Sequence, residues 1–221
     1  LSAELQQLLA VLFASVRASF PARDVHCIVN PAAGSAPYHR VALTAAKPFL
    51  DRSSSLDTNL SGLHVTEYPG HAMHIAEELL SQSSVTAPIV ILSVGGDGTH
   101  NEVLQPAAIR AAENNEPVSP EHAVFIRIPF GSGNDGADAD TLVECLFNLQ
   151  GQLTIRRGPM VWFKSGARSR AAFNIASAGL DAYITIVRQK LRGLLPGNSY
   201  RLIADAGVLL YEHLEKLGDA Q

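Results

Sequence analysis

The most constraining feature of the sequence is a short apolar run that ends directly in a glycine-containing loop, an arrangement that occurs three times. The runs are residues 25–29, 89–94 and 124–128. The loops that follow them are Asn30-Pro31-Ala32-Ala33-Gly34, Gly95-Gly96-Asp97-Gly98-Thr99 and Pro129-Phe130-Gly131-Ser132-Gly133-Asn134-Asp135. Continuous apolar runs are typical of strands buried on both faces, and helix-like stretches between them are typical of a parallel sheet. The sequence therefore predicts an α/β fold built on a parallel sheet.

Periodicity predicts the remaining elements. Apolar residues at helical spacing indicate helices, and alternating residues indicate strands. The predicted helices before residue 150 are 1–20, a stretch that follows Gly34 and ends near residue 50, 71–80, 99–112 and 141–149. A further strand is predicted at 63–68. After Leu153 strand-like stretches follow one another without helices, which predicts an antiparallel sheet. These stretches are 153–155, 160–164 and 170–176, and predicted helices at 181–191 and 200–217 come after them.

The net charge changes sign near the point where strands stop alternating with helices. Residues 1–150 contain 16 acidic and 7 basic residues, whereas residues 151–221 contain 5 acidic and 10 basic residues. Such a swing indicates either two regions with different surroundings or chance differences between solvated surfaces. We predict an α/β domain at 1–150 and the beginning of a β-rich domain at 151–221.

Composition excludes several classes of protein. The chain has 221 residues, of which 47% are hydrophobic and 17% are charged. This share of hydrophobic residues is too high for a disordered protein. No apolar run approaches the roughly 18 residues of a membrane span, so we expect a soluble globular protein. The two cysteines, Cys27 and Cys145, lie in apolar segments far apart in sequence. We interpret them as buried free thiols, which suggests a reducing, cytoplasmic location.

The three loops are predicted to form one site. In open α/β sheets ligands bind beyond the carboxyl ends of the strands, where these loops would meet. Glycine allows a ligand to approach the backbone closely, and the N–H groups of a helix's first turn point outward. This arrangement suits a phosphate group.

Asp97 is the candidate for chemistry in the middle loop. Thr99 and Glu102 have the spacing of a capping box, which would start a helix at Thr99 with Asp97 just ahead of its positive end. A carboxylate there could hold Mg²⁺ or orient a hydroxyl that attacks phosphorus. The alternative is an ordinary turn between a strand and a helix.

Other motifs suggest different functions. Residues 131–136 match the dinucleotide pattern G-x-G-x-x-G, and Arg156-Arg157 stand where an acidic residue is usual, as in an NADP-dependent oxidoreductase. His71 and His74 stand one helical turn apart and could ligate a metal, although no third ligand is near in sequence. Later in the chain there is a basic stretch, which comprises Arg188, Lys190, Arg192 and Arg201. These residues could contact phosphates, an anionic membrane or only solvent. The P-loop pattern is absent.

Taken in order, the three loops closely resemble the catalytic domain family of the diacylglycerol kinases. Asn101-Glu102-Val103 after the middle loop and residues 173–182, Phe-Asn-Ile-Ala-Ser-Ala-Gly-Leu-Asp-Ala, extend the resemblance. The family includes bacterial lipid kinases and sphingosine kinases and is related more distantly to NAD kinases. The resemblance implies a nucleotide domain, a mainly antiparallel β domain and an active site in the cleft between them. It also implies transfer of the ATP γ-phosphoryl group, with Mg²⁺, to a lipid hydroxyl in phospholipid biosynthesis.

The resemblance implies roles for particular residues. Asp97 would organise Mg²⁺ or activate the hydroxyl, and Asp181 would face the acceptor. Arg188 and Arg192 would reach the phosphates. The residues implied to line or complete the nucleotide pocket are Asn30, Gly34, Gly95, Gly96, Gly98, Thr99, Gly131, Ser132, Gly133, Asn134 and Asp135.

The same resemblance sets the expected partners and the alternatives. The predicted partners are a lipid alcohol substrate and, peripherally, a membrane surface, with no nucleic acid; a homodimer is also compatible with the sequence. Gly136-Ala137-Asp138-Ala139-Asp140 departs from the family pattern, and the family's late Asp-Gly-Glu motif has no match. We therefore expect the chain as given to be an incomplete catalyst. The alternatives are an NAD kinase-like phosphotransferase, an NADP-dependent oxidoreductase and a nucleotide-binding regulatory protein without catalysis.

Overall fold

The computed structural model describes most of the first three quarters of the chain. The described residues are 1–34, 36–51, 60–113, 115–131, 133–151, 153–166 and 168–173. All of them belong to one compact unit, Leu1–Asn174. The predicted site residues Ser132, Asp181, Arg188 and Arg192 lie outside the described residues, as do both helices predicted after residue 180. The domain boundary near residue 150 and the cleft between domains stay predictions.

A four-stranded parallel sheet forms the centre of the fold, as predicted. Its strands are β1 (Asp24–Val29), β2 (Leu63–Val65), β3 (Ile89–Gly95) and β4 (Ala123–Pro129), in the order β2-β1-β3-β4. Every neighbouring pair is parallel, with Val29 opposite both Val65 and Val94, and Gly95 opposite Pro129. The chain order of the strands reverses between β1 and β3, and such a switch point is where doubly wound sheets bind ligands.

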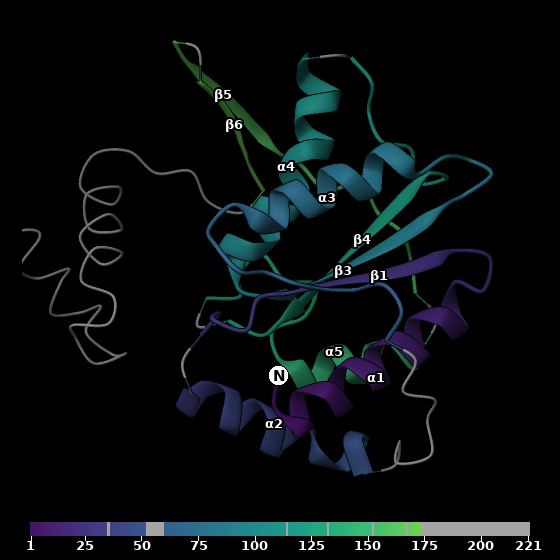
Figure 1. Ribbon diagram of the computed structural model, residues 1–221, viewed down its shortest axis with the longest axis vertical. Helices are drawn as coiled ribbons and strands as arrows, with labels where there is room; N and C mark the ends of the chain where they lie inside the picture. The colour runs from purple at the N-terminus through teal and green to yellow at the C-terminus, as the bar shows by residue number, and fades with distance from the viewer. Residues whose placement is uncertain are drawn as a thin grey trace, which may run out of the picture. The chain divides into compact units, whose positions relative to one another are not determined.

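Helices cover both faces of this sheet (Figure 1). One face carries α1 (Ala3–Ser19), α2 (Ala36–Asp51) and α5 (Leu142–Asn148), and the other carries α3 (His71–Gln82) and α4 (Asp97–Glu113). Strand residues alternate between the two cores because successive side chains point to opposite faces. Every residue of β3 is buried, as its continuous apolar sequence predicts.

The antiparallel sheet predicted after Leu153 corresponds to a hairpin. It consists of β5 (Val161–Ser165) and β6 (Arg168–Ala172), in which Val161 pairs with Ala172 and Phe163 with Arg170. The strand predicted at 153–155 is wrong, because those residues pair with no neighbouring strand. Leu153 instead packs against the core, and Ile155 is 45% exposed.

The strand predicted at 63–68 ends early, at Val65. The backbone N–H of Glu67 donates to Nδ1 of His71, and the carbonyl of Tyr68 accepts from the N–H of His71. These bonds turn the chain into α3 before the strand can continue.

Two smaller predictions can also be compared with the structure. Cys27 and Cys145 are buried free thiols, as predicted, and burial raises the pKa of Cys145 to about 12. Within the described part of the chain, none of the helices combines the length and apolar character needed to cross a bilayer.

Candidate active site

The loop after β1 is joined to the start of α4. Asn30 Nδ2 donates to Thr99 Oγ1 at 3.0 Å, and Asn30 Oδ1 accepts from the N–H of Ala32 at 3.0 Å. The backbone N–H of Asn30 donates to the carbonyl of Val94, the residue opposite the end of β1. The first and second loops therefore meet at the carboxyl edge of the sheet.

The second and third loops are in even closer contact, at Gly96 and Gly131. A Cβ added at Gly131 would lie 2.2 Å from Cα of Gly96, and a Cβ added at Gly96 would lie 2.8 Å from the carbonyl oxygen of Gly133. Two backbone bonds hold the loops together: the Asp97 N–H donates to Gly133 at 2.9 Å and the Phe130 N–H to Gly95 at 2.8 Å. Glycine is required here because the two backbones touch.

The capping box predicted at the start of α4 is wrong. The helix begins at Asp97, so Thr99 lies within its first turn, and the Thr99 hydroxyl accepts from Asn30. Glu102 Oε1 instead accepts from the backbone N–H of Gly70, the residue before α3, at 3.0 Å. Both side chains thus hold neighbouring segments to α4 and do not cap it.

Asp97 is half-buried at the positive end of α4. Its Oδ1 accepts from the backbone N–H of Gly136 at 2.7 Å. Its Oδ2 lies on the side of Gly133, where an added Cβ would be 3.0 Å away. The carboxylate is therefore fixed between the second and third loops with one oxygen tied to the backbone.

Backbone donors lie next to this carboxylate. Among the described residues, no group accepts a hydrogen bond from the backbone N–H of Gly98 or Thr99. Gly98 is exposed, and a Cβ added there would meet nothing within 4 Å. These two donors suit an anion at the start of the helix.

Asn134 holds the third loop in its curved form. Its Oδ1 accepts from the N–H of Gly131 at 2.9 Å, and its Nδ2 donates to the carbonyl of Gly131 and to the Tyr38 hydroxyl. Asp135 beside it is exposed. Gly34, at φ +73°, brings the first loop close to Gly131.

Comparison with known families identifies the segment that contains this site. The family of the diacylglycerol kinase catalytic domain matches residues 24–147, more than half of the chain. The chain belongs to the diacylglycerol kinase catalytic domain family. The match spans β1 to α5 and includes all three loops. Membership places the chain in the superfamily of lipid and NAD kinase-like phosphotransferases. A comparison with curated proteins finds no match.

Two residues of α2 contact the third loop but were not among the site residues predicted from the sequence. The His39 ring stacks on Phe130 with centroids 4.3 Å apart, and Nε2 of His39 lies 3.3 Å from the Phe130 carbonyl oxygen. Tyr38 bonds Asn134 at 2.8 Å. Their only sequence signal is that an aromatic pair follows the first loop.

His100 is a third residue that the sequence analysis did not single out. It is buried on α4, where Nδ1 bonds Ser93 Oγ at 2.8 Å and Nε2 has no partner among the described residues. Burial, and then the charge of Arg127, lowers the pKa of His100 to about 4, although Asp138 acts in the opposite direction. A cavity of about 20 Å³ is lined by His100 and Asp97, together with residues that include Arg127 and Gly136.

Two of the remaining sequence motifs have structural explanations, whereas the basic stretch from Arg188 to Arg201 lies outside the described residues. Tyr68 stacks on His71 at 4.4 Å, and its hydroxyl lies 3.3 Å from Nδ1 of His74, so the two histidines pack around a tyrosine. Among the described residues, no group of three or more His, Cys, Asp or Glu side chains could hold a metal ion. Residues 131–136 do not open a helix, since α5 begins only at Leu142, and the dinucleotide pattern therefore lacks its structural context.

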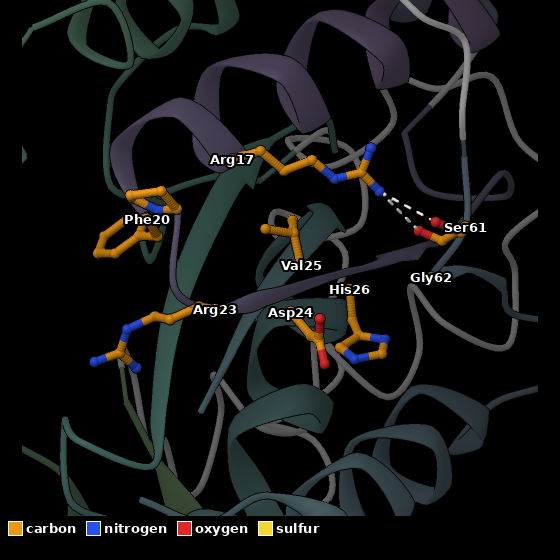
Figure 2. Close-up of a pocket in the computed structure, with 9 residues that line it drawn as sticks. Arg17, Phe20, Arg23, Asp24, Val25, His26, Ser61 and Gly62 are labelled. Atoms are coloured by element: carbon orange, nitrogen blue, oxygen red, sulfur yellow. Dashed lines mark hydrogen bonds between the residues drawn. The ribbon is translucent and has the colours of Figure 1, made fainter. Parts of the chain in front are cut away.

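A larger hollow of about 390 Å³ lies at the opposite edge of the sheet, near the start of β1 (Figure 2). Arg17 donates to the carbonyl oxygen and hydroxyl of Ser61, and Arg23 donates to the carbonyl oxygens of Ile89 and Pro120. The two guanidinium groups point in different directions in Figure 2 and do not converge on one point. This hollow is remote from the family's three loops, so we assign the site to the carboxyl edge.

Proposed function

We propose that the protein is an ATP- and Mg²⁺-dependent kinase that transfers the γ-phosphoryl group to the hydroxyl of a diacylglycerol- or sphingoid-like lipid. The observation that carries this proposal is the position of Asp97. It stands at the start of α4, between two loops packed backbone to backbone, within the segment that matches the kinase family. Four site residues implied by the resemblance lie outside the described part, and their roles stay predictions. They are Ser132, Asp181, Arg188 and Arg192.

The described residues fit a nucleotide phosphate. The N–H groups of Gly98 and Thr99 would donate to phosphate oxygens, and the positive end of α4 would favour their charge. The open space beside Gly98 allows the phosphate to reach the backbone. Phosphoryl transfer depends mainly on positioning and on stabilising charge, which backbone donors on a rigid sheet edge can supply.

Asp97 would take part through the oxygen that is not tied to Gly136. Mg²⁺ usually binds one or two protein carboxylates together with substrate phosphates, so a single carboxylate beside the phosphate donors fits the ion. Bound ATP with Mg²⁺ would supply the transferable phosphoryl group and part of its charge neutralisation. The Gly136 N–H fixes the direction of the carboxylate, so that its free oxygen is held beside the phosphates or the lipid hydroxyl.

The test is Asp97→Asn in the full-length protein, assayed with radiolabelled ATP on short-chain diacylglycerol, sphingosine and NAD. The amide oxygen of asparagine can still accept from Gly136, so we expect the fold and ATP binding to remain. Loss of the charge should lower turnover at least about a hundredfold. The matched control is Asp51→Asn, because Asp51 is an exposed partner of Lys47 on α2 and such pairs contribute little.

Near-normal turnover in Asp97→Asn would contradict the role proposed for this carboxylate. Phosphorylation of NAD and of neither lipid would favour the NAD kinase-like alternative. ATP binding without transfer to any acceptor would favour a regulatory nucleotide-binding protein.

A further inference from the structure

The hairpin of β5 and β6 has one face against the protein and one face in solvent. On the inner face, Ala171 is 2% exposed. Buried Gln105 of α4 donates to the Ala171 carbonyl at 2.6 Å and accepts from its N–H at 3.0 Å. This pair of bonds fixes the hairpin to α4, past which it projects in Figure 1.

The outer face is exposed and carries apolar residues beside Arg170, the cross-strand partner of Phe163. Val161 and Phe163 alternate with the inner residues and are 59% and 47% exposed. The segment that leads into β5 also exposes Ile155, at 45%, and Met160, at 37%. Exposed large apolar residues are individually ordinary, but their concentration along one short segment marks an interaction surface.

The same stretch of chain is strongly basic. Residues 151–173 contain five basic residues and no acidic residue. Arg156, Arg157, Lys164 and Arg170 are exposed, and in the described part of the chain none of them forms an ion pair. Here "hairpin patch" means the apolar residues Ile155, Met160, Val161 and Phe163 together with Arg156 and Arg157.

We propose that the hairpin patch docks the protein on the surface of an anionic lipid bilayer. The proposal rests on the proposed function, because a lipid hydroxyl acceptor resides in such a bilayer. Apolar side chains enter the boundary of the acyl chains, while arginines remain at the anionic headgroups. Nucleic acid would match the charge but would leave the aliphatic side chains in water. The bilayer interface accommodates both kinds of side chain at once.

The proposal is tested by co-sedimentation with vesicles of phosphatidylcholine and phosphatidylglycerol, and with vesicles of phosphatidylcholine alone, without ATP or acceptor lipid. We expect binding to the anionic vesicles that weakens with added salt. Arg156→Gln with Arg157→Gln should weaken it about 25-fold, since each basic residue near the surface contributes about a factor of five. Phe163→Ser should weaken it about tenfold or more through the lost apolar contact.

Two matched controls lie elsewhere on the same compact unit. Phe147→Ser removes a phenylalanine that is 68% exposed on α5, and Arg40→Gln removes an exposed arginine on α2. Neither should change vesicle binding. Circular dichroism of each variant tests whether a loss of binding comes from unfolding. All five altered side chains are exposed, so we expect the fold to be kept.

Three results would overturn the proposal. They are equal binding to both kinds of vesicle, unchanged binding after the hairpin substitutions, and binding of a protein partner or a nucleic acid with none to vesicles. The outcome is independent of the proposed function, because vesicle binding is measured without turnover. If no lipid is phosphorylated but the hairpin variants still lose vesicle binding, the kinase proposal fails and the docking surface stands. Kinase activity on a dispersed short-chain acceptor should be the same in the hairpin variants and in the unaltered protein.

Discussion

Alanine substituted at Gly131 and at Gly98 should have opposite effects on stability, although both glycines lie in the same site. At Gly131 the new Cβ would be 2.2 Å from Cα and 2.6 Å from N of Gly96. Carbon atoms in contact prefer about 3.5–4.0 Å, so the two loops must separate by more than about 1 Å. Overpacking of this kind costs about 1–3 kcal/mol.

The separation would also strain the bonds between the loops. The Asp97 N–H bond to Gly133 and the Phe130 N–H bond to Gly95 would lengthen, and each contributes about 1 kcal/mol. We therefore expect Gly131→Ala to lower the free energy of unfolding by about 2–4 kcal/mol. The melting temperature should fall by about 5–15 °C.

Gly98→Ala should instead leave stability unchanged or raise it slightly. A Cβ at Gly98 meets nothing within 4 Å, and alanine is favoured over glycine in a helix by up to about 1 kcal/mol. The methyl group would, however, occupy the open space through which a phosphate reaches the backbone. We expect ATP binding, measured by titration calorimetry, to weaken at least about tenfold while the melting temperature holds.

The pair of variants separates folding from binding. Wild-type stability in Gly131→Ala would show that the loops are not in backbone contact. Wild-type ATP affinity in a stable Gly98→Ala protein would show that the phosphates do not lie at the start of α4.

Two further predictions concern the buried polar groups of α4. Gln105→Leu leaves the N–H and carbonyl of Ala171 without a partner, which costs about 1–3 kcal/mol for each group. Hydrogen exchange in β6, measured by mass spectrometry, should become at least about tenfold faster. Unchanged protection of β6 would contradict this prediction. His100, with its pKa lowered to about 4 from 6.5, is held neutral by the fold, whereas the unfolded chain binds the proton. Its contribution to stability is complete above about pH 6.5 and is lost as the pH falls toward 4, by about 2 kcal/mol between pH 7 and pH 5. His26 and His64, whose pKa values are also lowered by burial, act in the same direction. In urea unfolding, the double variant Ser93→Ala, His100→Leu should lose less of its free energy of unfolding between pH 7 and pH 5 than the unaltered protein. An identical loss would refute the assignment of this pH dependence to His100.

The parts of the fold that the sequence predicts correctly are those decided by local residues. The apolar run of β3 is buried throughout, and its following loop lies at the carboxyl edge, because both properties follow from residues adjacent in sequence. The end of β2 was not predictable, since it depends on the ring nitrogen of His71 accepting from Glu67. Alternation at 153–155 likewise gave no strand, because a strand needs a partner that periodicity does not supply.

The site shows the same division between local and distant contacts. The sequence was sufficient to predict which loops form the site, but not which residues their side chains would bond. Thr99 and Glu102 have capping-box spacing, yet each bonds a segment far away in the chain, at Asn30 and Gly70. Tyr38 bonds a residue 96 positions away, so no local pattern indicates its role.

The composition of the three loops constrains how the proposed nucleotide would be held. None of the loops contains a lysine or an arginine, and Arg127 at the end of β4 is already paired with Asp138 at 2.7 Å. A helix start stabilises an anion by about 0.3–1 kcal/mol, which is small beside the several negative charges of a triphosphate. Backbone donors at Gly98 and Thr99 can fix the direction of the phosphates, but they cannot neutralise them. The remaining positive charge would have to come from Mg²⁺ held beside Asp97 or from arginines later in the chain. The acidic character of residues 1–150 is then compatible with nucleotide binding, because the loops contribute geometry and the cations contribute charge.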